Sequence, residues 1–388
     1  MSQSKILCIG NGWFPLMPGG LNRYVYESIH HLSQLGSSIE FCGVGIPNQA
    51  ECSLSASIQL TNLCDSKAFL VHRLLSAWRY FANRKVAPCP DAINLHFALY
   101  GLPILSILPA EIPITFTFHG PWALEGQQES ENRITTLLKH WIEQQVYQRC
   151  DRFIVLSRAF GEVLHQHYQI PWSKIYLIPG GVDTERFQPR LTQQAARQHL
   201  HWPSNRPILF TPRRLVPRMG LDQLLTALVQ VRQQIPDVWL AIAGRGPLQT
   251  QLQQQCRDAG LSDTVQFLGF LPDDQLPIAY QAANLTVVPS QALEGFGLVV
   301  LESLACGTPV VCTPVGGMPE ILQPFAPQLL IPDTTVHAIA THLVAALSGE
   351  LLLPSSTDCR AYVKQHFDWH SISQQIQQVL LQSGKKST

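Results

Sequence analysis

Short apolar runs alternate with amphipathic stretches through the first half of the chain. The runs are typical of strands buried on both faces, and they lie at residues 5–10, 39–44, 92–96, 114–119, 153–157 and 175–178. Helical periodicity occurs between them, at residues 21–35, 102–108, 131–148 and 159–167. Because parallel strands need a crossover connection, usually a helix, this alternation predicts an α/β domain with a doubly wound parallel sheet.

The alternation stops near residue 188 and then starts again. Residues 186–207 are rich in Gln and Pro and show no strand, so we interpret them as a connection between domains. A second series of strands is predicted at residues 208–211, 239–243, 265–268, 285–288, 309–312 and 328–331. The pattern therefore predicts two Rossmann-like domains facing a central cleft, residues 1–190 and 191–368, followed by a helical segment at 369–388.

Composition restricts the class of protein. A hydrophobic fraction of 46% is enough for two cores, and 27 basic against 27 acidic residues give no support for a nucleic-acid partner. The 10 cysteines form no CxxC pair, which is typical of a reducing compartment rather than of a disulfide framework or a zinc site. The apolar run at 6–9 is too short for a signal peptide. We expect a cytoplasmic protein.

Residues 66–85 combine an apolar face with several cations. Helical spacing predicts that one face is shared by Leu70, Leu74, Trp78 and Phe81. The cations are Lys67, Arg73, Arg79, Arg84 and Lys85. An ordinary packed helix with a solvated basic edge explains this pattern, and it is the interpretation that we favour. The alternative is a helix that lies on the inner face of an anionic membrane.

Two carboxylates flank a predicted helix start in the stretch 289–321. Glu294 follows a strand, Gly295-Phe296-Gly297 leads into a helix at Leu298, and Glu302 lies on that helix. Ligands of open parallel sheets bind at the carboxyl ends of the strands, and the free amides of a helix start favour an anion, typically phosphate. A phosphate site beside two carboxylates that accept hydrogen bonds from hydroxyl groups is the pattern expected for a sugar nucleotide.

A basic loop follows the first strand of the second domain. Arg213, Arg214 and Arg218 lie within six positions there, and guanidinium groups bind phosphate oxygens in bidentate fashion. A solvated loop is the plain alternative. Gly244, in the glycine-rich loop after the next strand, can approach a phosphate closely, although a tight turn explains it equally well.

Three features of the first domain bear on the ligand. The pair Gly19-Gly20 directly precedes a helix, where backbone amides can approach a phosphate, although a plain loop remains an alternative. The earlier Gly10-Asn11-Gly12 does not match a dinucleotide fingerprint, because Pro15 stands where the third glycine is needed. His119 ends a strand and can stabilise charge or bond a sugar hydroxyl. No DxD motif occurs, so we expect neither a bound metal nor another cofactor.

Taken in order along the whole chain, these residues resemble glycosyltransferase family 4, retaining enzymes with the two-domain GT-B fold. The similar segments are Gly19-Gly20-Leu21, His119, PGGVDTERFQP at 179–189, RRLVPRMG at 213–220, the run at 269–290, and Glu294 followed eight residues later by Glu302. The combination is specific, whereas each segment alone is weak.

The resemblance implies a role for each residue. Glu294 would bond the donor sugar, Glu302 the ribose and Arg214 the diphosphate. The amides of Gly297 and Leu298, with Gly20 beside them, would receive the distal phosphate, and backbone near Phe270 and Leu271 would contact the base. His119, Arg214 and Glu294 are thus the expected catalytic residues of a metal-independent enzyme. The resemblance also implies that the helix within 369–388 crosses back onto the first domain.

One departure from the family pattern concerns the basic loop. Lysine commonly precedes its glycine, and this chain has Met219, which cannot neutralise phosphate. The usual glycine before Arg214 is also replaced, by Arg213. Either Arg213 or Arg218 supplies the second cation, or the diphosphate is held more weakly.

The resulting hypothesis is a transferase that moves a hexosyl group from a nucleoside diphosphate sugar to a glycan, a lipid or a small molecule. Two alternatives stay open. A sugar-nucleotide epimerase of the same fold would need a further acid/base carboxylate pair, which the sequence does not show. A non-catalytic nucleotide-sugar-binding protein is suggested by Met219, but His119, Arg214, Glu294 and Glu302 are all present.

Overall fold

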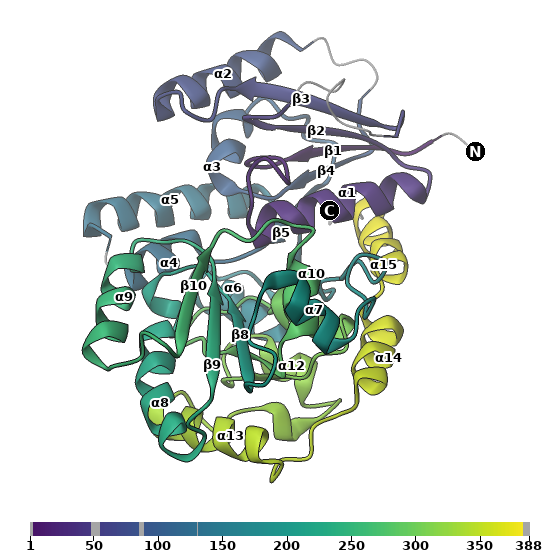
Figure 1. Ribbon diagram of the computed structural model, residues 1–388. Coiled ribbons are helices and arrows are strands. Elements are labelled where there is room, and N and C mark those ends of the chain that lie inside the picture. The colour runs from purple at the N-terminus through teal and green to yellow at the C-terminus, as the bar shows by residue number, and fades with distance from the viewer. Residues whose placement is uncertain (1–2, 48–54, 85–88, 130, 383–388) are drawn as a thin grey trace. The chain divides into compact units, whose positions relative to one another are not determined.

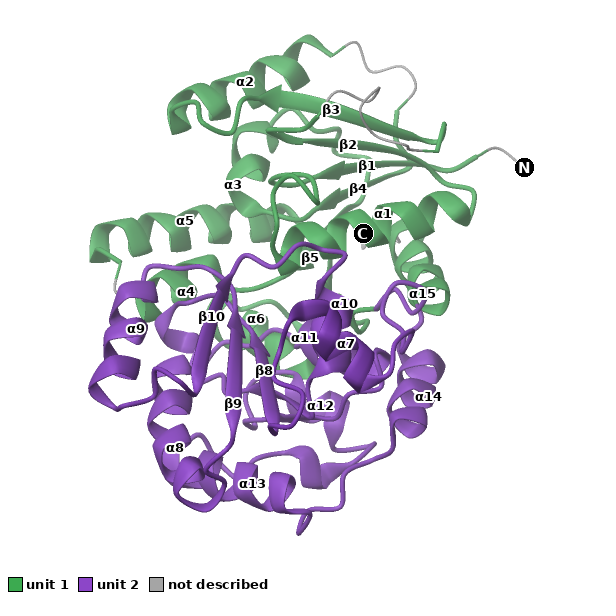
Figure 2. Ribbon diagram, viewed as in Figure 1, with its two compact units in different colours: residues 1–181, 369–388 green, residues 182–368 purple. Residues whose placement is uncertain are grey.

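A computed structural model describes residues 3–47, 55–84, 89–129 and 131–382 of the chain. The chain forms two compact units, one of residues 1–181 with 369–388 and one of residues 182–368 (Figure 2). Each unit contains a sheet of parallel strands linked by helices (Figure 1). The predicted fold class, two doubly wound parallel-sheet α/β domains, is confirmed.

Unit 1 contains a seven-stranded sheet in the order β3-β2-β1-β4-β5-β6-β7. Its strands are β1 Lys5–Ile9, β2 Ser38–Val44, β3 Ile58–Cys64, β4 Ala92–Leu95, β5 Ile114–Phe118, β6 Arg152–Val155 and β7 Ile175–Leu177. The strand order reverses direction between β1 and β4, which pair in parallel. At such a switch point the loops diverge to the two faces of the sheet, so the carboxyl ends of β1, β4 and β5 are where a ligand site is expected.

One apolar cluster covers a face of this sheet, and it draws side chains from α2, α3, η2, α5 and α6. The helices and 3₁₀ turns of unit 1 are α1 Gly20–Gln34, α2 Leu70–Asn83, α3 Ala98–Gly101, η2 Leu102–Ile104, α4 Trp122–Gln128, α5 Arg133–Arg149, α6 Arg158–Tyr168, η3 Trp172–Lys174 and α15 Trp369–Leu381. The C-terminal α15 packs against α1. Arg152 in β6 holds its end, donating to the carbonyl oxygens of Val379 (3.0 Å) and Gln382 (2.6 Å).

Unit 2 contains a five-stranded sheet in the order β10-β9-β8-β11-β12. Its strands are β8 Ile208–Pro212, β9 Trp239–Ala243, β10 Val265–Gly269, β11 Leu285–Val288 and β12 Val310–Cys312. The helices and 3₁₀ turns are α7 Gln193–Leu200, η4 Pro217–Met219, α8 Leu221–Gln234, α9 Gln249–Asp258, α10 Leu276–Ala282, α11 Leu298–Ala305, α12 Met318–Leu322, η5 Pro327–Leu329, α13 Val336–Ser348 and α14 Ser356–His366. The reversal of strand order now falls between β8 and β11.

The structure differs from the sequence-based prediction at three places. Strand β3 was not predicted; as an edge strand it alternates only weakly and keeps polar residues such as Gln59 and Asn62 in solvent. Residues 328–331 do not form a strand, because η5 leaves only a single bridge from Leu330 to Cys312. The Gln-rich stretch 186–207 contains α7, which packs on α10.

The apolar face predicted for residues 66–85 is also different in the structure. Phe81 is buried and Leu74 packs against the apolar cluster, whereas Leu70 and Trp78 are exposed. The helix therefore presents apolar side chains both to the core and to solvent, because its exposed positions carry Val71, Leu75 and Trp78 instead of polar residues. Lys85 lies outside the described residues.

Candidate functional site

Two loops meet at the carboxyl ends of β8 and β11, which are neighbours in the sheet of unit 2. The first loop starts at Arg213, whose amide donates to the carbonyl of Ala243 at 2.8 Å and so extends the pairing of β8 with β9. Backbone segments pack tightly here: a Cβ on Gly244, which has φ of 142°, would lie 1.9 Å from the Arg213 carbonyl oxygen. Gly244 therefore serves close packing of these loops as well as any ligand contact.

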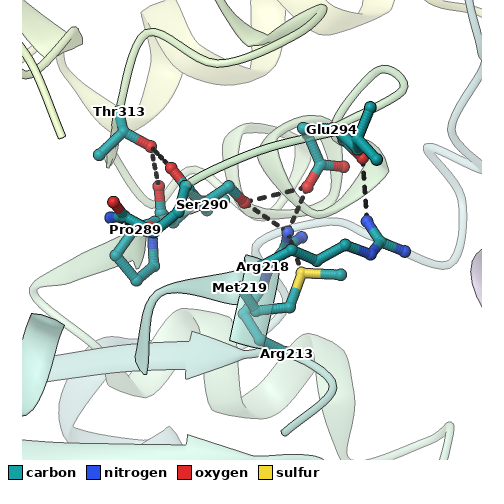
Figure 3. Close-up of polar contacts among 10 residues, drawn as sticks. Arg213, Arg218, Met219, Pro289, Ser290, Glu294 and Thr313 are labelled. Atoms are coloured by element: carbon teal, nitrogen blue, oxygen red, sulfur yellow. Dashed lines mark hydrogen bonds and ion pairs between the residues drawn. The ribbon is translucent and has the colours of Figure 1, made fainter. Parts of the chain in front are cut away.

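Arg213 is the centre of a buried polar cluster (Figure 3). Its Nη2 donates to Ser290 Oγ at 2.6 Å, contacts Met219 Sδ at 2.7 Å and forms an ion pair with Glu294 Oε2. Ser290 also donates to the same carboxylate oxygen at 3.1 Å. Thr313 holds Ser290 in place by donating to its carbonyl oxygen at 2.5 Å. The cluster thus joins residues separated by 81 positions in the sequence.

The Glu294 carboxylate is ionised because cations surround it. Burial alone would raise the pKa of Glu294, but the ion pair and hydrogen bond from Arg213, the charge of Arg218 and the Ser290 hydroxyl together lower it below its usual value. An ionised carboxylate accepts hydrogen bonds and donates none. Its available chemistry is therefore the binding of hydroxyl groups or of a cation.

Arg218 has a different role from Arg213. It is buried, and its Nη1 donates to the carbonyl oxygen of Leu293 at 2.9 Å. Leu293 has φ of 49°, in the left-handed region that a leucine rarely adopts. The hydrogen bond from Arg218 stabilises the strained turn that precedes Glu294. Arg213, one of the two arginines considered as replacements for the missing lysine, places its guanidinium against the Met219 side chain.

The turn that carries Glu294 is also packed from the other side. The amide of Gly317 donates to the Glu294 carbonyl oxygen at 3.1 Å. A Cβ on Gly316 would lie 1.7 Å from that oxygen, so no larger residue fits there without moving the turn. The position of the carboxylate is consequently set by two loops that come from β11 and β12.

Helix α11 begins directly after this turn. Gly297 is its N-cap and lies next to Leu298 and half-buried Gly295, while Phe296 is buried against Phe367 with ring centroids 5.9 Å apart. Glu302 is buried on the same helix and accepts a hydrogen bond of 2.8 Å from Tyr280 Oη. Tyr280 lies in the family-like run 269–290, but the sequence pattern assigned it no role of its own, because its contact with Glu302 joins α10 to a different helix.

The remaining predicted residues of unit 2 lie nearer the surface. Arg214 is exposed, whereas its neighbour Arg213 is buried. Phe270 is exposed and the guanidinium of Arg245 lies over its ring, 5.8 Å from the centroid; Leu271 is half-buried. These side chains stay accessible, as residues that meet a ligand must.

In unit 1 the predicted residues lie at the carboxyl end of β5 and at the start of α1. No atom lies within 4 Å of a Cβ added to Gly19 or Gly20, so the turn before α1 is open. His119 follows β5 and is half-buried; its Nε2 lies 3.1 Å from Nδ1 of His96, which follows β4. Burial lowers the pKa of His119 to about 3, so its imidazole is neutral at physiological pH. His96 was overlooked in the sequence, although it ends a strand just as His119 does.

Arg213, Arg218, Glu294 and Met219 are brought together in one cluster of unit 2, whereas Glu302 pairs with Tyr280. Gly19, Gly20 and His119 belong to unit 1. No group of three or more His, Cys, Asp or Glu side chains that could hold a metal ion occurs among the described residues.

Comparison with known proteins assigns the family. Residues 192–366 match the family described as Glycosyl transferases group 1, and residues 18–186 match Glycosyltransferase Family 4. The two matches follow one another along the chain and cover both units. The chain belongs to family 4 of the glycosyltransferases, as the resemblance predicted.

Similar proteins are known in several organisms. The chain is 36% identical over 177 residues to a GDP-mannose-dependent α-(1-6)-phosphatidylinositol monomannoside mannosyltransferase of Mycolicibacterium smegmatis, covering 44% of this chain and 46% of that protein. The match thus spans about half the length of that relative. A D-inositol 3-phosphate glycosyltransferase of Corynebacterium aurimucosum is 26% identical over 384 residues, covering 93% of this chain and 90% of that protein.

Among solved structures, sucrose-phosphate synthase from Thermosynechococcus elongatus has a similar fold. The TM-score is 0.80 at 23% sequence identity, and the match covers 97% of this chain and 98% of that one. This likeness supports the fold of both units.

Proposed function

We propose that this protein transfers a hexosyl group, with retention of anomeric configuration and without a metal ion, from a nucleoside diphosphate sugar to a hydroxyl group of an acceptor. The observation that carries the proposal is the ionised Glu294 held by Arg213 and Ser290 at the carboxyl ends of β8 and β11. An acceptor-only carboxylate beside an arginine and a helix start suits a ligand with both hydroxyl groups and phosphates. Membership of the glycosyltransferase family supports the same reaction.

Each part of the donor has a matching group in unit 2. Glu294 would accept hydrogen bonds from sugar hydroxyls, and the diphosphate would lie between exposed Arg214 and the amides of Gly297 and Leu298 at the start of α11. Glu302 would accept from the ribose hydroxyls with its position held by Tyr280. Backbone at Phe270 and Leu271 would meet the base. In unit 1, the open turn at Gly19 and Gly20 would suit the close approach of a phosphate oxygen.

Arg213 would supply the cation that Met219 does not. Its guanidinium already lies against the Met219 thioether, and Arg218 is engaged with the carbonyl oxygen of Leu293. A bound diphosphate would share Arg213 with Glu294. The attraction between Arg213 and the phosphate would then offset part of the weakened attraction between Arg213 and Glu294. Relative to the family pattern, Arg213 stands in place of a glycine and Met219 in place of a lysine. The positive charge of this loop would then come from position 213 instead of position 219.

The reaction needs no group on the protein that forms a covalent intermediate. The acceptor oxygen would bond to the anomeric carbon as the bond from that carbon to the diphosphate oxygen breaks, and the acceptor proton would move to the leaving phosphate. The arginines and the amides at the start of α11 would stabilise the charge that develops on the phosphate. Glu294, kept ionised by its neighbours, would position the sugar and transfer no proton.

The acceptor is proposed to be a polyol or a lipid-linked polyol. The relatives that support this are named for inositol phosphate and for a phosphatidylinositol mannoside, and GDP-mannose is the donor in the name of one of them. A glycan or another small molecule remains the broader class. The proposal includes neither nucleic acid nor a cofactor.

A single assay separates this function from its two alternatives. Purified protein is incubated with GDP-mannose, UDP-glucose and UDP-N-acetylglucosamine in turn, with inositol 1-phosphate or inositol 3-phosphate as acceptor and with EDTA present. Release of nucleoside diphosphate with an α-linked product, read by NMR of the anomeric proton, is the expected result. Sugar isomerisation without release would indicate an epimerase. Thermal stabilisation without either would indicate a binding protein.

We also propose that the protein docks on the inner face of an anionic membrane through α2. Phe69 is 90% exposed and Trp78 is 46% exposed, and Leu75 lies between them on the outward side. Lys67 and Arg79 are exposed beside these apolar side chains, and residues 66–90 contain no Asp or Glu. Apolar side chains with flanking cations fit the interface of a bilayer with negative headgroups. No helix among the described residues is long and apolar enough to cross a membrane.

Vesicle sedimentation tests this contact. The protein is expected to sediment with vesicles that contain phosphatidylglycerol and to remain in solution with pure phosphatidylcholine. The variant Phe69→Ser/Trp78→Ser is expected to lose this binding. Leu352→Ser is a matched control, because Leu352 is 82% exposed but lies in unit 2 without such cations nearby in sequence. Equal sedimentation of both variants would remove α2 as the docking surface.

A further inference from the structure

A line of buried polar side chains connects the carboxyl ends of β4 and β5 in unit 1. Thr117 Oγ1 donates to Asn94 Oδ1 at 2.9 Å, and Asn94 Nδ2 lies 3.1 Å from His96 Nε2. His96 Nδ1 lies in turn 3.1 Å from His119 Nε2. Only His119, at the end of the line, is more than marginally exposed; His96 is 2% exposed, and Asn94 and Thr117 are equally buried.

The direction of these bonds follows from the chemistry of each group. The Thr117 hydroxyl occupies the amide oxygen of Asn94, so the amide nitrogen faces His96, and an amide nitrogen can only donate. His96 Nε2 must therefore accept. A neutral imidazole carries one proton, which places the proton of His96 on Nδ1 and directs it to His119 Nε2. Nε2 of His119 is then an acceptor too, and its proton lies on Nδ1.

Both rings are neutral, which this assignment requires. Burial lowers the pKa of His96 well below its usual value, with a further contribution from His119. Burial likewise lowers the pKa of His119. The backbone also anchors the line, because the amide of His96 donates to the Ile9 carbonyl oxygen at 2.8 Å and ties it to β1.

We propose that Thr117, Asn94 and His96 hold His119 in the tautomer with its proton on Nδ1, so that His119 presents a hydrogen-bond donor to the ligand. The three residues are positioning residues, since they act through His119. The group that His119 meets would be an oxygen with a lone pair, such as a sugar hydroxyl or a phosphate oxygen, which rests on the proposed function. In the opposite tautomer Nδ1 would accept and would repel the same oxygen.

The tautomer can be measured in the protein without any substrate. Long-range ¹H–¹⁵N spectra of protein labelled with ¹⁵N-histidine distinguish a protonated ring nitrogen from a bare one, and the variant His119→Gln identifies the His119 signals. The expected result is a protonated Nδ1 and a bare Nε2 on His119. A proton on Nε2, or a mixture of both tautomers, would overturn the proposal.

Two isosteric variants in the same strand test the role of the line. Thr117→Val removes the hydroxyl that orients Asn94, and it is expected to give mixed tautomers of His119. Thr115→Val is its control: the Thr115 hydroxyl is also buried, but it has no hydrogen-bond partner among the described residues, so the His119 spectrum should stay unchanged. Identical His119 spectra of the two variants would contradict the positioning role. Asn94→Leu, which removes the donor to His96, provides a second test with the same expected mixture.

Turnover measurements then relate the tautomer to function. With the donor found by the panel assay, Thr117→Val is expected to lower kcat by about tenfold, the scale of one hydrogen bond in a buried site, with Thr115→Val close to wild type. Equal turnover of the two variants would show that the ligand does not use the Nδ1 proton. If no donor is turned over, the proposed function fails, while the spectra still decide the tautomer.

Discussion

Glu143 of unit 1 and Glu294 of unit 2 are both largely removed from solvent, and the two carboxylates respond to burial in opposite ways. In unit 1, Glu143 receives only neutral hydrogen-bond donors: Tyr168 Oη, the amides of Trp122 and Ala123, and Tyr147 Oη. Burial raises the pKa of Glu143 to about 7 in spite of these bonds. In unit 2, Glu294 faces Arg213, and its pKa is lowered although burial alone would raise it.

The difference shows what each glutamate is suited for. Glu143 caps the first turn of α4, just after His119, and works as a structural acceptor for backbone and phenol groups. Glu294 is kept charged at neutral pH by a cation, at the carboxyl end of a parallel sheet where ligands bind. A nearby cation, rather than the number of hydrogen bonds, distinguishes the two sites. The following predictions test this comparison.

The largest effect is expected from Glu294→Gln. The substitution keeps the size of the side chain but removes the charge that pairs with Arg213 and that we propose binds the donor hydroxyls. We expect kcat/KM for the donor sugar to fall by about 100-fold, as for loss of a charged group in a preorganised site. Glu350→Gln, an exposed change in the same unit, is the control. Donor kinetics within twofold of wild type would remove Glu294 from the donor site.

Moving the positive charge should give the next largest effect. Arg213→Gly is expected to lower kcat/KM by at least about tenfold, because the phosphate loses a cation and Glu294 loses its ion-pair partner. The double variant Arg213→Gly/Met219→Lys restores a cation on the other side of the loop, and we expect it to recover most of the loss. Steady-state donor kinetics of the two variants provide the test. A double variant no better than the single one would show that Arg213 does more than supply charge.

Glu143→Gln should change the pH dependence of the stability of unit 1. The pH dependence of the stability of unit 2 should stay unchanged. Because the folded pKa is raised, the contribution of Glu143 to stability is complete below its usual pKa and is lost as the pH rises through about 7. The loss between pH 5 and pH 8 is expected to be on the order of 2 kcal/mol. Gln stays neutral, so this variant should lack that loss.

Urea unfolding at several pH values, followed for the variant, the wild type and exposed Glu111→Gln, measures the effect. A wild-type protein whose stability instead rises through this pH range relative to Glu143→Gln would mean that Glu143 is ionised in the fold, like Glu294.

The smallest effect on the donor is expected from Arg218→Ala. Its bond to Leu293 supports the strained turn, so the loss should lower stability by about 1–2 kcal/mol. We expect the KM for the donor to change less in Arg218→Ala than in Arg213→Gly. Thermal unfolding and donor titration of the same preparation separate the two quantities. A donor KM that rises tenfold with no loss of stability would place Arg218 on the phosphate.

Much of the architecture was readable from the chain. Strands such as β1 and β11 are buried on both faces and so form continuous apolar runs, and α1 and α11 have clear glycine starts. The stretch with Glu294 and Glu302 was also legible, because strand, turn and helix are local. Strand β3 and helix α7 were not, since an edge strand and a Gln-rich helix carry a weak hydrophobic pattern.

The side-chain partners could not be read in the same way. Arg213 and Arg214 are neighbours in the chain, yet one is buried and the other exposed, because successive residues leave a strand end in opposite directions. Which of them meets Glu294 depends on the pairing of β8 with β11, between residues 81 positions apart. The state of His119 depends likewise on β4 lying beside β5. Local pattern specifies the elements, whereas charge and tautomer are set by contacts that exist only after the strands have paired.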